Sequence, residues 1–265
     1  MKNLKLFQTL GAVSCVTLLF SVQSCKKKTT DPTPAPVSTN GTVLLHLHTN
    51  VDTNEVDTYG KVYFMSGVRK VSVNLAQLYL SSIQLVKTDG TTFDLTGLNV
   101  LKVMEMEEYL LSTAVPSGNY RSIRFNVGLA PASDVVAPAA NDSTLNKANM
   151  WFGSTASTGH IFLNFQGKID TSAAATNSVS QMRPFSYRIG TNSNLKNVIL
   201  PNQNYTILPN QAQYIHITIE YSKLFNNIQL NNASNLMVNT AADNAGPLAI
   251  LLSNNIVSMF RYEIQ

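Results

Sequence analysis

Two of the four histidines in this 265-residue chain stand two positions apart, in the stretch VLLHLHTNV. Its strict alternation predicts a strand in which Val43, Leu45 and Leu47 point one way, while His46 and His48 point to the opposite face. Residues at i and i+2 of a strand lie about 6.6 Å apart at Cα, so both imidazoles can reach a shared ion. Neutral imidazole suits copper, zinc or nickel. His46 and His48 are therefore candidate metal ligands, and the competing interpretation is a pair of polar residues on the outer face of a strand.

The other two histidines also stand in alternating stretches. In YIHITIE the isoleucines form the predicted core face and His216 lies opposite. In GHIFLNF the residues Ile161, Leu163 and Phe165 are predicted to point inward and His160 outward. All four histidines are thus predicted on faces away from the strongest apolar alternation. His216 is the best third ligand if the first strand and a late strand are neighbours, and His160 is a further candidate.

Several catalytic classes lack their motifs in this chain. It contains no Gly-rich phosphate loop, no GxSxG nucleophile motif, no HExxH helix and no EF-hand loop. Carboxylates cluster only in MEMEE, where Glu105 and Glu107 share one face of an extended segment and Glu108 takes the other. A glycosidase pair would need two carboxyl groups facing a sugar cleft, and we interpret the cluster instead as a solvated strand or turn. The sequence predicts that the protein is not an enzyme.

The first 41 residues predict export and a lipid anchor. Residues 1–24 combine a basic start, an apolar stretch too short to span a membrane and a small residue before Cys25, which is typical of a lipoprotein signal peptide. Cys25 is the predicted lipidated residue. The other cysteine, Cys15, would leave with the signal, so the mature chain would have no disulfide, no thiolate metal site and no cysteine nucleophile. Residues 25–41 predict an extended tether rich in Pro and Thr.

The net charge of the chain is concentrated at this start. The formal charge of +4 comes from 19 basic and 15 acidic side chains. Lys2 and Lys5 belong to the predicted signal, and the three lysines after Cys25 belong to the predicted tether, which leaves 14 basic against 15 acidic side chains. A near-neutral domain offers no basic field for nucleic acid. The CKKK run either contacts anionic headgroups beside the anchor or serves as a solubilising leader. The predicted location is the cell envelope, as an outer-membrane lipoprotein with a periplasmic or surface orientation.

Strand signals dominate residues 42–265, which we predict to form one domain. Runs rich in Val, Ile, Tyr and Phe alternate with clusters of Asn, Gly, Asp and Pro. This pattern predicts an all-β fold, a single β-sandwich of prealbumin-like or immunoglobulin-like architecture with at most one or two short helices. The stretch GPLAILLSNN predicts one such helix, which begins at Pro247 and stops at the paired asparagines. The long loops 130–149 and 171–180 are either binding loops or surface insertions.

Four segments in order resemble the MbnP-like family of envelope proteins associated with methanobactin and copper handling. They are AQLYLSSIQLVKTDG, VPSGNYRSIRFNVGL, MWFGSTASTGHIFLNFQGKID and FSYRIG. The resemblance covers roughly residues 44–200. The residues that match the family pattern include Tyr79, Ile83, Leu85, Asp89, Gly90, Val115, Pro116, Gly118, Tyr120, Phe125, Gly128, Met150, Gly159, Ile161, Phe162, Gly167, Tyr187, Ile189 and Gly190.

The resemblance implies copper as the ligand, held by histidines. In some members a tryptophan is oxidised to kynurenine by a partner, a dihaem peroxidase-like protein. By this resemblance Trp151, the single tryptophan of this chain, is the residue that would be oxidised, whereas a lone tryptophan in an aromatic run is otherwise a core or corner residue. Two positions depart from the family pattern. Gly153 follows Trp151-Phe152 where one relative has a W-x-H spacing, and Arg188 stands where a histidine is common, although a guanidinium cannot ligate a metal.

The sequence therefore predicts a lipid-anchored cell-envelope protein of the MbnP-like family that binds and delivers a metal, with copper as the candidate cofactor. The alternative is a surface or periplasmic lipoprotein without a metal, which binds a glycan or another protein through its long loops. The V-P-x-G-x-Y strand also recurs in prealbumin-like domains of envelope lipoproteins that have no metal, and this keeps the alternative open.

Overall fold

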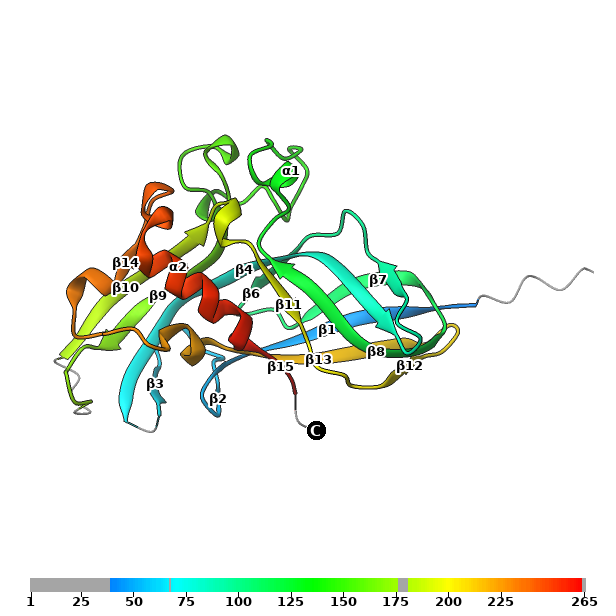
Figure 1. Cartoon of the computed structure of the whole chain (residues 1–265), viewed down its shortest axis with the longest axis horizontal. Coiled ribbons are helices and arrows are strands. Elements are labelled where there is room, and N and C mark those ends of the chain that lie inside the picture. The colour runs from blue at the N-terminus through cyan, green and yellow to red at the C-terminus, as the bar shows by residue number, and fades with distance from the viewer. Residues whose placement is uncertain (1–38, 67, 176–180, 264–265) are drawn as a thin grey trace, which may run out of the picture. The chain divides into compact units, whose positions relative to one another are not determined.

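The structure of the protein is a computed structural model that describes residues 39–66, 68–175 and 181–263. The predicted signal peptide, the predicted lipid site Cys25 and almost all of the predicted tether lie outside these ranges, as does the second half of loop 171–180. Within them, the strands form two sheets that share one main hydrophobic core (Figure 1). This arrangement confirms the predicted all-β, sandwich-like architecture.

The smaller sheet is built around the first strand. In the described part of the chain, β13 pairs with one side of β1, whereas β7 and β2 pair with the other side, and β15 extends the sheet beyond β13. Its strands are β1 (Asn40–Val51), β2 (Asn54–Glu55), β7 (Glu108–Pro116), β13 (Ala212–Glu220) and β15 (Phe260–Tyr262).

The larger sheet is built around β4, a strand of 19 residues. Along its length β4 pairs with β8 and β9 and with three short strands. The strands of this sheet are β3 (Val62–Met65), β4 (Arg69–Lys87), β5 (Thr92–Asp94), β6 (Val100–Val103), β8 (Gly118–Val127), β9 (Ile161–Asp170), β10 (Met182–Gly190), β11 (Lys196–Ile199), β12 (Tyr205–Ile207) and β14 (Met237–Val238).

Helices are few and short, as predicted. α2 (Pro247–Ile256) begins at Pro247, whose missing N–H is tolerated in the first turn, and it buries Ala249, Leu252 and Ile256. α1 (Pro131–Asp134) is a single turn inside the predicted loop 130–149. In the part of the chain that the structure describes, the other helical segments are 3-10 turns: η1 (Ala148–Met150), η2 (Ala156–Thr158), η4 (Asn192–Asn194), η5 (Tyr221–Phe225), η6 (Ala233–Asn235), η7 (Ala242–Ala245) and η8 (Val257–Met259). None of the helices in the described ranges is both long and apolar enough to cross a membrane.

The alternation of β1 is as predicted from its sequence. Val43, Leu45 and Leu47 are fully buried in the main core, while His46 and His48 on the other face are partly exposed. Burial of the aliphatic side chains fixes the register, because a slip of one residue would exchange the two faces. The core therefore holds the two imidazoles on the outer surface of the smaller sheet.

A second, smaller hydrophobic cluster lies apart from the main core. Tyr79, Leu129, Met150 and Phe162 are fully buried in it, and Leu145 from the long loop 130–149 packs against it. The loop therefore covers the larger sheet, and both faces of β9 are buried where it begins. This cluster explains why β9 lacks the simple alternation that its sequence predicts.

Gly167 marks a close contact between β4 and β9 in the larger sheet. β9 pairs with β4 through Val73 and Gly167, next to an irregularity in the register. A Cβ atom at Gly167 would overlap the backbone carbonyl oxygen of Ser72, and Phe185 closes the other side. The absence of a side chain is thus required for these strands to approach each other.

Candidate metal centre

Three of the four histidines meet on the outer face of the smaller sheet. β1 and β13 run parallel and side by side, and His46 is the direct register partner of His216 (Figure 1). His48 follows two residues later on the same face of β1. The ring of His46 lies 4.4 Å from that of His48 and 4.8 Å from that of His216, measured between centroids. The structure thus brings together the predicted pair and the predicted third ligand.

The ring nitrogens of this three-histidine cluster converge with one carboxylate. His46 Nδ1 and His216 Nδ1 are 3.1 Å apart. Glu263, which follows β15, places Oε2 3.4 Å from His216 Nδ1 and 3.5 Å from His48 Nε2. A suitable ligand atom of each histidine lies within 4.8 Å of those of the other two.

Two further carboxylates face the nitrogens on the other side of the rings. Glu107 Oε2 lies 3.0 Å from His46 Nε2, and Glu55 Oε1 lies 2.7 Å from His48 Nδ1. The hydrogen bond from His46 lowers the pKa of the Glu107 carboxyl. A histidine that ligates a metal usually donates its second N–H to such a carboxylate, which fixes the tautomer and the orientation of the ring. Glu55 and Glu107 are therefore placed to orient the ligands, and together with His48 they also form a second group whose ligand atoms lie within 4.8 Å of one another.

The donor set fits a late first-row metal ion. A tetrahedral ion with bonds of about 2.0–2.1 Å separates its ligand atoms by roughly 3.3 Å, close to the observed separations. Imidazole nitrogen suits copper and zinc, and carboxylate oxygen is also a common zinc ligand. The side chains of His46, His48 and His216 are 21%, 18% and 29% exposed, so an ion can reach them from solvent.

The turn that carries Glu107 is held in place by hydrogen bonds from a buried lysine. Lys102, on β6, is 1% exposed, and its Nζ donates to the carbonyl oxygens of Val103 and Met106 at 2.9 and 2.6 Å. Tyr109 also donates to the Met106 carbonyl, at 3.0 Å. The MEMEE segment, which the sequence predicts to be a solvated strand or turn, is thus a turn whose backbone is held in place and whose Glu107 faces His46.

Burial of Lys102 predicts a specific dependence of stability on pH. Desolvation lowers the pKa of this ammonium from 10.5 to about 8, and the nearby carboxylates of Glu107, Glu105 and Glu55 offset only part of that effect. Between these two pKa values the unfolded chain binds more protons than the folded one, so this group makes stability rise with pH. We therefore compare the free energies of unfolding of the wild type and of Lys102→Met. The value for the wild type minus that for the variant should increase by about 1 kcal/mol from about pH 7 to about pH 9.

Urea denaturation at several pH values would measure this difference. The exposed Lys61 is a matched control, because Lys61→Met should leave the pH dependence of the wild type unchanged. An equal pH dependence in the wild type and Lys102→Met would contradict the prediction.

The fourth histidine is not on an outer face, and that prediction is wrong. His160 is fully buried beside the second cluster, where its ring lies edge-on to Tyr79. Its Nδ1 is 2.5 Å from the carbonyl oxygen of Asp134 and its Nε2 is 3.3 Å from that of Leu145. Both nitrogens therefore face loop 130–149. Within the described residues, His160 belongs to no group of side chains that could hold a metal ion.

Trp151 lies next to His160 and away from the three-histidine cluster. The two residues form an isolated antiparallel bridge, and the indole N–H of Trp151 donates to the carbonyl of Leu145 at 3.2 Å. Arg188 donates to the Trp151 carbonyl at 2.6 Å and lies over the ring of Phe152. No hydrogen bond or ring contact within the described ranges joins Trp151 to His46, His48 or His216. The oxidation of Trp151 by a partner stays a prediction.

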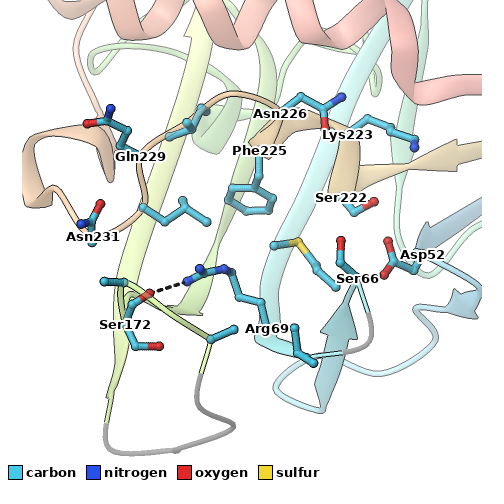
Figure 2. A pocket seen from close by; sticks show the side chains of 16 residues that line it. Asp52, Ser66, Arg69, Ser172, Ser222, Lys223, Phe225, Asn226, Gln229 and Asn231 are labelled. Atoms are coloured by element: carbon cyan, nitrogen blue, oxygen red, sulfur yellow. Dashed lines mark hydrogen bonds between the residues drawn. The ribbon is translucent and has the colours of Figure 1, made fainter.

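A separate cavity of about 500 Å³ opens beyond the end of β1. Figure 2 shows Arg69, which donates to the carbonyl of Ser172 at 3.1 Å, below Phe225 and Lys223 on the opposite wall. Part of the predicted loop 171–180 therefore lines a hollow of mixed polar and apolar character. No histidine lines this cavity and Asp52 is its one carboxylate among the described residues, so the convergent metal donors lie elsewhere.

Sequence reasoning identified the three histidines but not their carboxylate partners. The sequence distinguishes Glu107 only as a member of the MEMEE cluster, and no sequence pattern identifies Glu263. Glu55 is brought opposite Asn50 by the short hairpin between β1 and β2, which the sequence does not predict.

Comparisons with known proteins give one family and one solved structure. A family model described as MbnP matches residues 40–240 of the chain. No curated protein sequence matches it. Among solved structures, MbnP from Methylosinus trichosporium is similar, with 16% sequence identity, a TM-score of 0.47, and coverage of 70% of this chain and 78% of that chain.

Proposed function

Because the chain belongs to the MbnP family, which is linked to copper, we propose that it binds a copper or zinc ion through His46, His48 and His216. The observation that carries this proposal is the 3.1 Å separation of two ring nitrogens from parallel strands, with a third histidine on the same face. Nitrogens at such a distance repel through their lone pairs unless a proton or a metal ion lies between them.

The chemistry that we propose is binding and transfer of the ion rather than catalysis. Partial exposure of the three rings supports exchange of the ion with an incoming or outgoing carrier. The surrounding carboxylates of Glu55, Glu107 and Glu263 add negative charge, which attracts cations and raises their local concentration. We further propose that Cys25 carries a lipid and holds the protein in the cell envelope, where such an exchange would take place.

A metal titration tests the proposed function. Purified protein is loaded with Cu(II) or Zn(II), desalted and analysed for metal by mass spectrometry. We expect about one ion per chain for a single site of this size. His46→Ala and His216→Ala should each weaken binding by at least about 100-fold, because each removes a donor nitrogen.

The matched control is Thr42→Ala, a partly exposed residue on the same face of β1 as His46 but outside the cluster. It should bind metal like the wild type. The proposed metal binding would be refuted by substoichiometric metal in the wild type, or by equal metal affinity of the wild type and both histidine variants. In that case the alternative is a ligand in the cavity of Figure 2, which loop 171–180 helps to line.

A further inference from the structure

The last described residue of the chain reaches the three-histidine cluster. β15 pairs antiparallel with β13, and the backbone N–H of Glu263 donates to the carbonyl of His216 at 3.1 Å. We infer that Glu263 is the fourth donor of the centre, and that its carboxylate makes the site prefer a divalent ion, Cu(II) or Zn(II), to Cu(I). This inference rests on the proposed function and specifies which ion the site selects.

The carboxylates around the cluster differ in the ring nitrogen that they face. Glu107 lies against Nε2 of His46, and Glu55 lies against Nδ1 of His48. In the tautomers that donate to these carboxylates, the lone pairs are on His46 Nδ1 and His48 Nε2. Glu55 and Glu107 therefore orient the rings and leave one nitrogen of each free for an ion.

Glu263 lies on the side where those free nitrogens converge. Its Oε2 is 3.5 Å from His48 Nε2 and 3.4 Å from His216 Nδ1, and the latter atom is 3.1 Å from His46 Nδ1. These three separations are close to the roughly 3.3 Å expected between ligands of a tetrahedral ion, whereas the group whose ligand atoms all lie within 4.8 Å of one another holds the three histidines without Glu263. Glu263 therefore has to move closer to His46 or His48 to complete the tetrahedron. Glu263 is thus placed as a donor to the ion, whereas Glu55 and Glu107 are placed as partners of the histidines.

A carboxylate donor changes which ion the centre selects. Three neutral imidazoles alone accept either oxidation state of copper, since imidazole is a ligand of intermediate softness. Glu263 adds a hard oxygen and a negative charge in direct contact with the ion. The Coulomb attraction of that charge is twice as large for a divalent ion as for a monovalent one at the same distance. Soft Cu(I) gains least from an oxygen donor.

The fourth donor comes from a part of the chain that the family match does not reach. The match ends at residue 240, whereas β15 and Glu263 lie beyond it. The three histidines all lie inside the matched range. The preference for a divalent ion is therefore a property of this chain, and the family match alone does not predict it.

The substitution Glu263→Gln tests the inference, because Gln keeps the length of the side chain and the backbone N–H that binds His216. We expect it to raise the Kd for Cu(II) by at least about tenfold and the Kd for Cu(I) by less than about threefold, as measured by competition with chelators. The Cu(II) electron paramagnetic resonance spectrum should also change its hyperfine coupling, because an oxygen donor is replaced. Circular dichroism of the apo protein should be unchanged.

Glu108→Gln is the matched control, since Glu108 is an exposed carboxylate on β7 and its Cα is the register partner of His46. It should reproduce wild-type affinity and spectrum. If the wild type binds Cu(II) and Glu263→Gln binds it with the same affinity and spectrum, this inference is overturned and the proposed function stands. If Cu(I) binding falls as much as Cu(II) binding, the preference is overturned. A wild type that binds neither ion overturns both proposals.

Discussion

Saturation with Cu(II) or Zn(II) is expected to raise the free energy of unfolding by about 2.7 kcal/mol when the free ion exceeds its Kd about 100-fold. The physical reason is that the donors from β1 and β13 are 170 positions apart in the chain and meet only in the folded protein. The His46-x-His48 pair can still bind an ion weakly when unfolded, and this would reduce the gain. For a domain of this size the midpoint of thermal unfolding should rise by about 5–10 °C.

Differential scanning calorimetry with added metal and with a chelator measures this rise. The double variant His46→Ala with His216→Ala should show the same midpoint in both conditions, because it lacks a donor from each strand. A wild type that holds one ion but unfolds at the same temperature with and without it would contradict the prediction, since the ion would then bind the unfolded chain equally well.

The second large effect is expected at Gly167, whose replacement by Ala should destabilise the fold by more than about 4 kcal/mol. The added Cβ would overlap the backbone oxygen of Ser72, and a backbone atom of β4 at a position paired with both β3 and β9 cannot move aside as a flexible side chain could. β4 and β9 would have to separate at the centre of the larger sheet. Soluble yield and urea denaturation followed by circular dichroism would measure the loss.

Gly60→Ala is the matched control for this substitution. Gly60 has a conformation that favours glycine, with φ +77°, whereas Gly167 does not, and no atom lies within 4 Å of the Cβ added at Gly60. Its cost should be limited to backbone strain of about 1–2 kcal/mol. If the free energy of unfolding of Gly167→Ala lies within about 1 kcal/mol of that of the wild type, the close approach of β4 and β9 is not required for stability.

Local sequence patterns correctly predict the features of this structure that are determined by residues close together in the sequence. The alternation of VLLHLH placed His46 and His48 on the outer face because burial of the intervening aliphatic residues sets the face. The Pro at the start of GPLAILLSNN placed the first residue of α2 for a similarly local reason. The sandwich-like all-β class followed from the recurrence of such strands.

Contacts between distant parts of the chain could not be predicted in the same way. The sequence made His216 the best third ligand only on condition that the first and a late strand are neighbours, and no local pattern reveals that β1 and β13 pair in register. Glu263 was missed for the same reason. Its role depends on the docking of the three-residue strand β15 against β13, which is too short to produce a periodic signal.

The prediction for His160 is wrong because an alternating pattern does not reveal that β9 packs against a hydrophobic cluster on each of its faces. β9 is buried on both faces at its start, since loop 130–149 covers the second cluster there. The ring of His160 donates an N–H to a carbonyl oxygen of loop 130–149, that of Asp134 or Leu145, and such a hydrogen bond is how a polar ring becomes tolerable inside a protein. Alternation alone cannot distinguish such a covered face from a solvated one.

The parallel pairing of β1 with β13 also decides when a metal ion can be bound during biosynthesis. His46 and His48 are among the earliest residues of the described chain to be synthesised, and His216 follows 170 positions after His46. A nascent chain that ends before β13 therefore presents at most a weak two-histidine chelate. Tight binding of an ion therefore requires that β13 has been synthesised and has paired with β1, so a tightly bound ion indicates that the smaller sheet has formed.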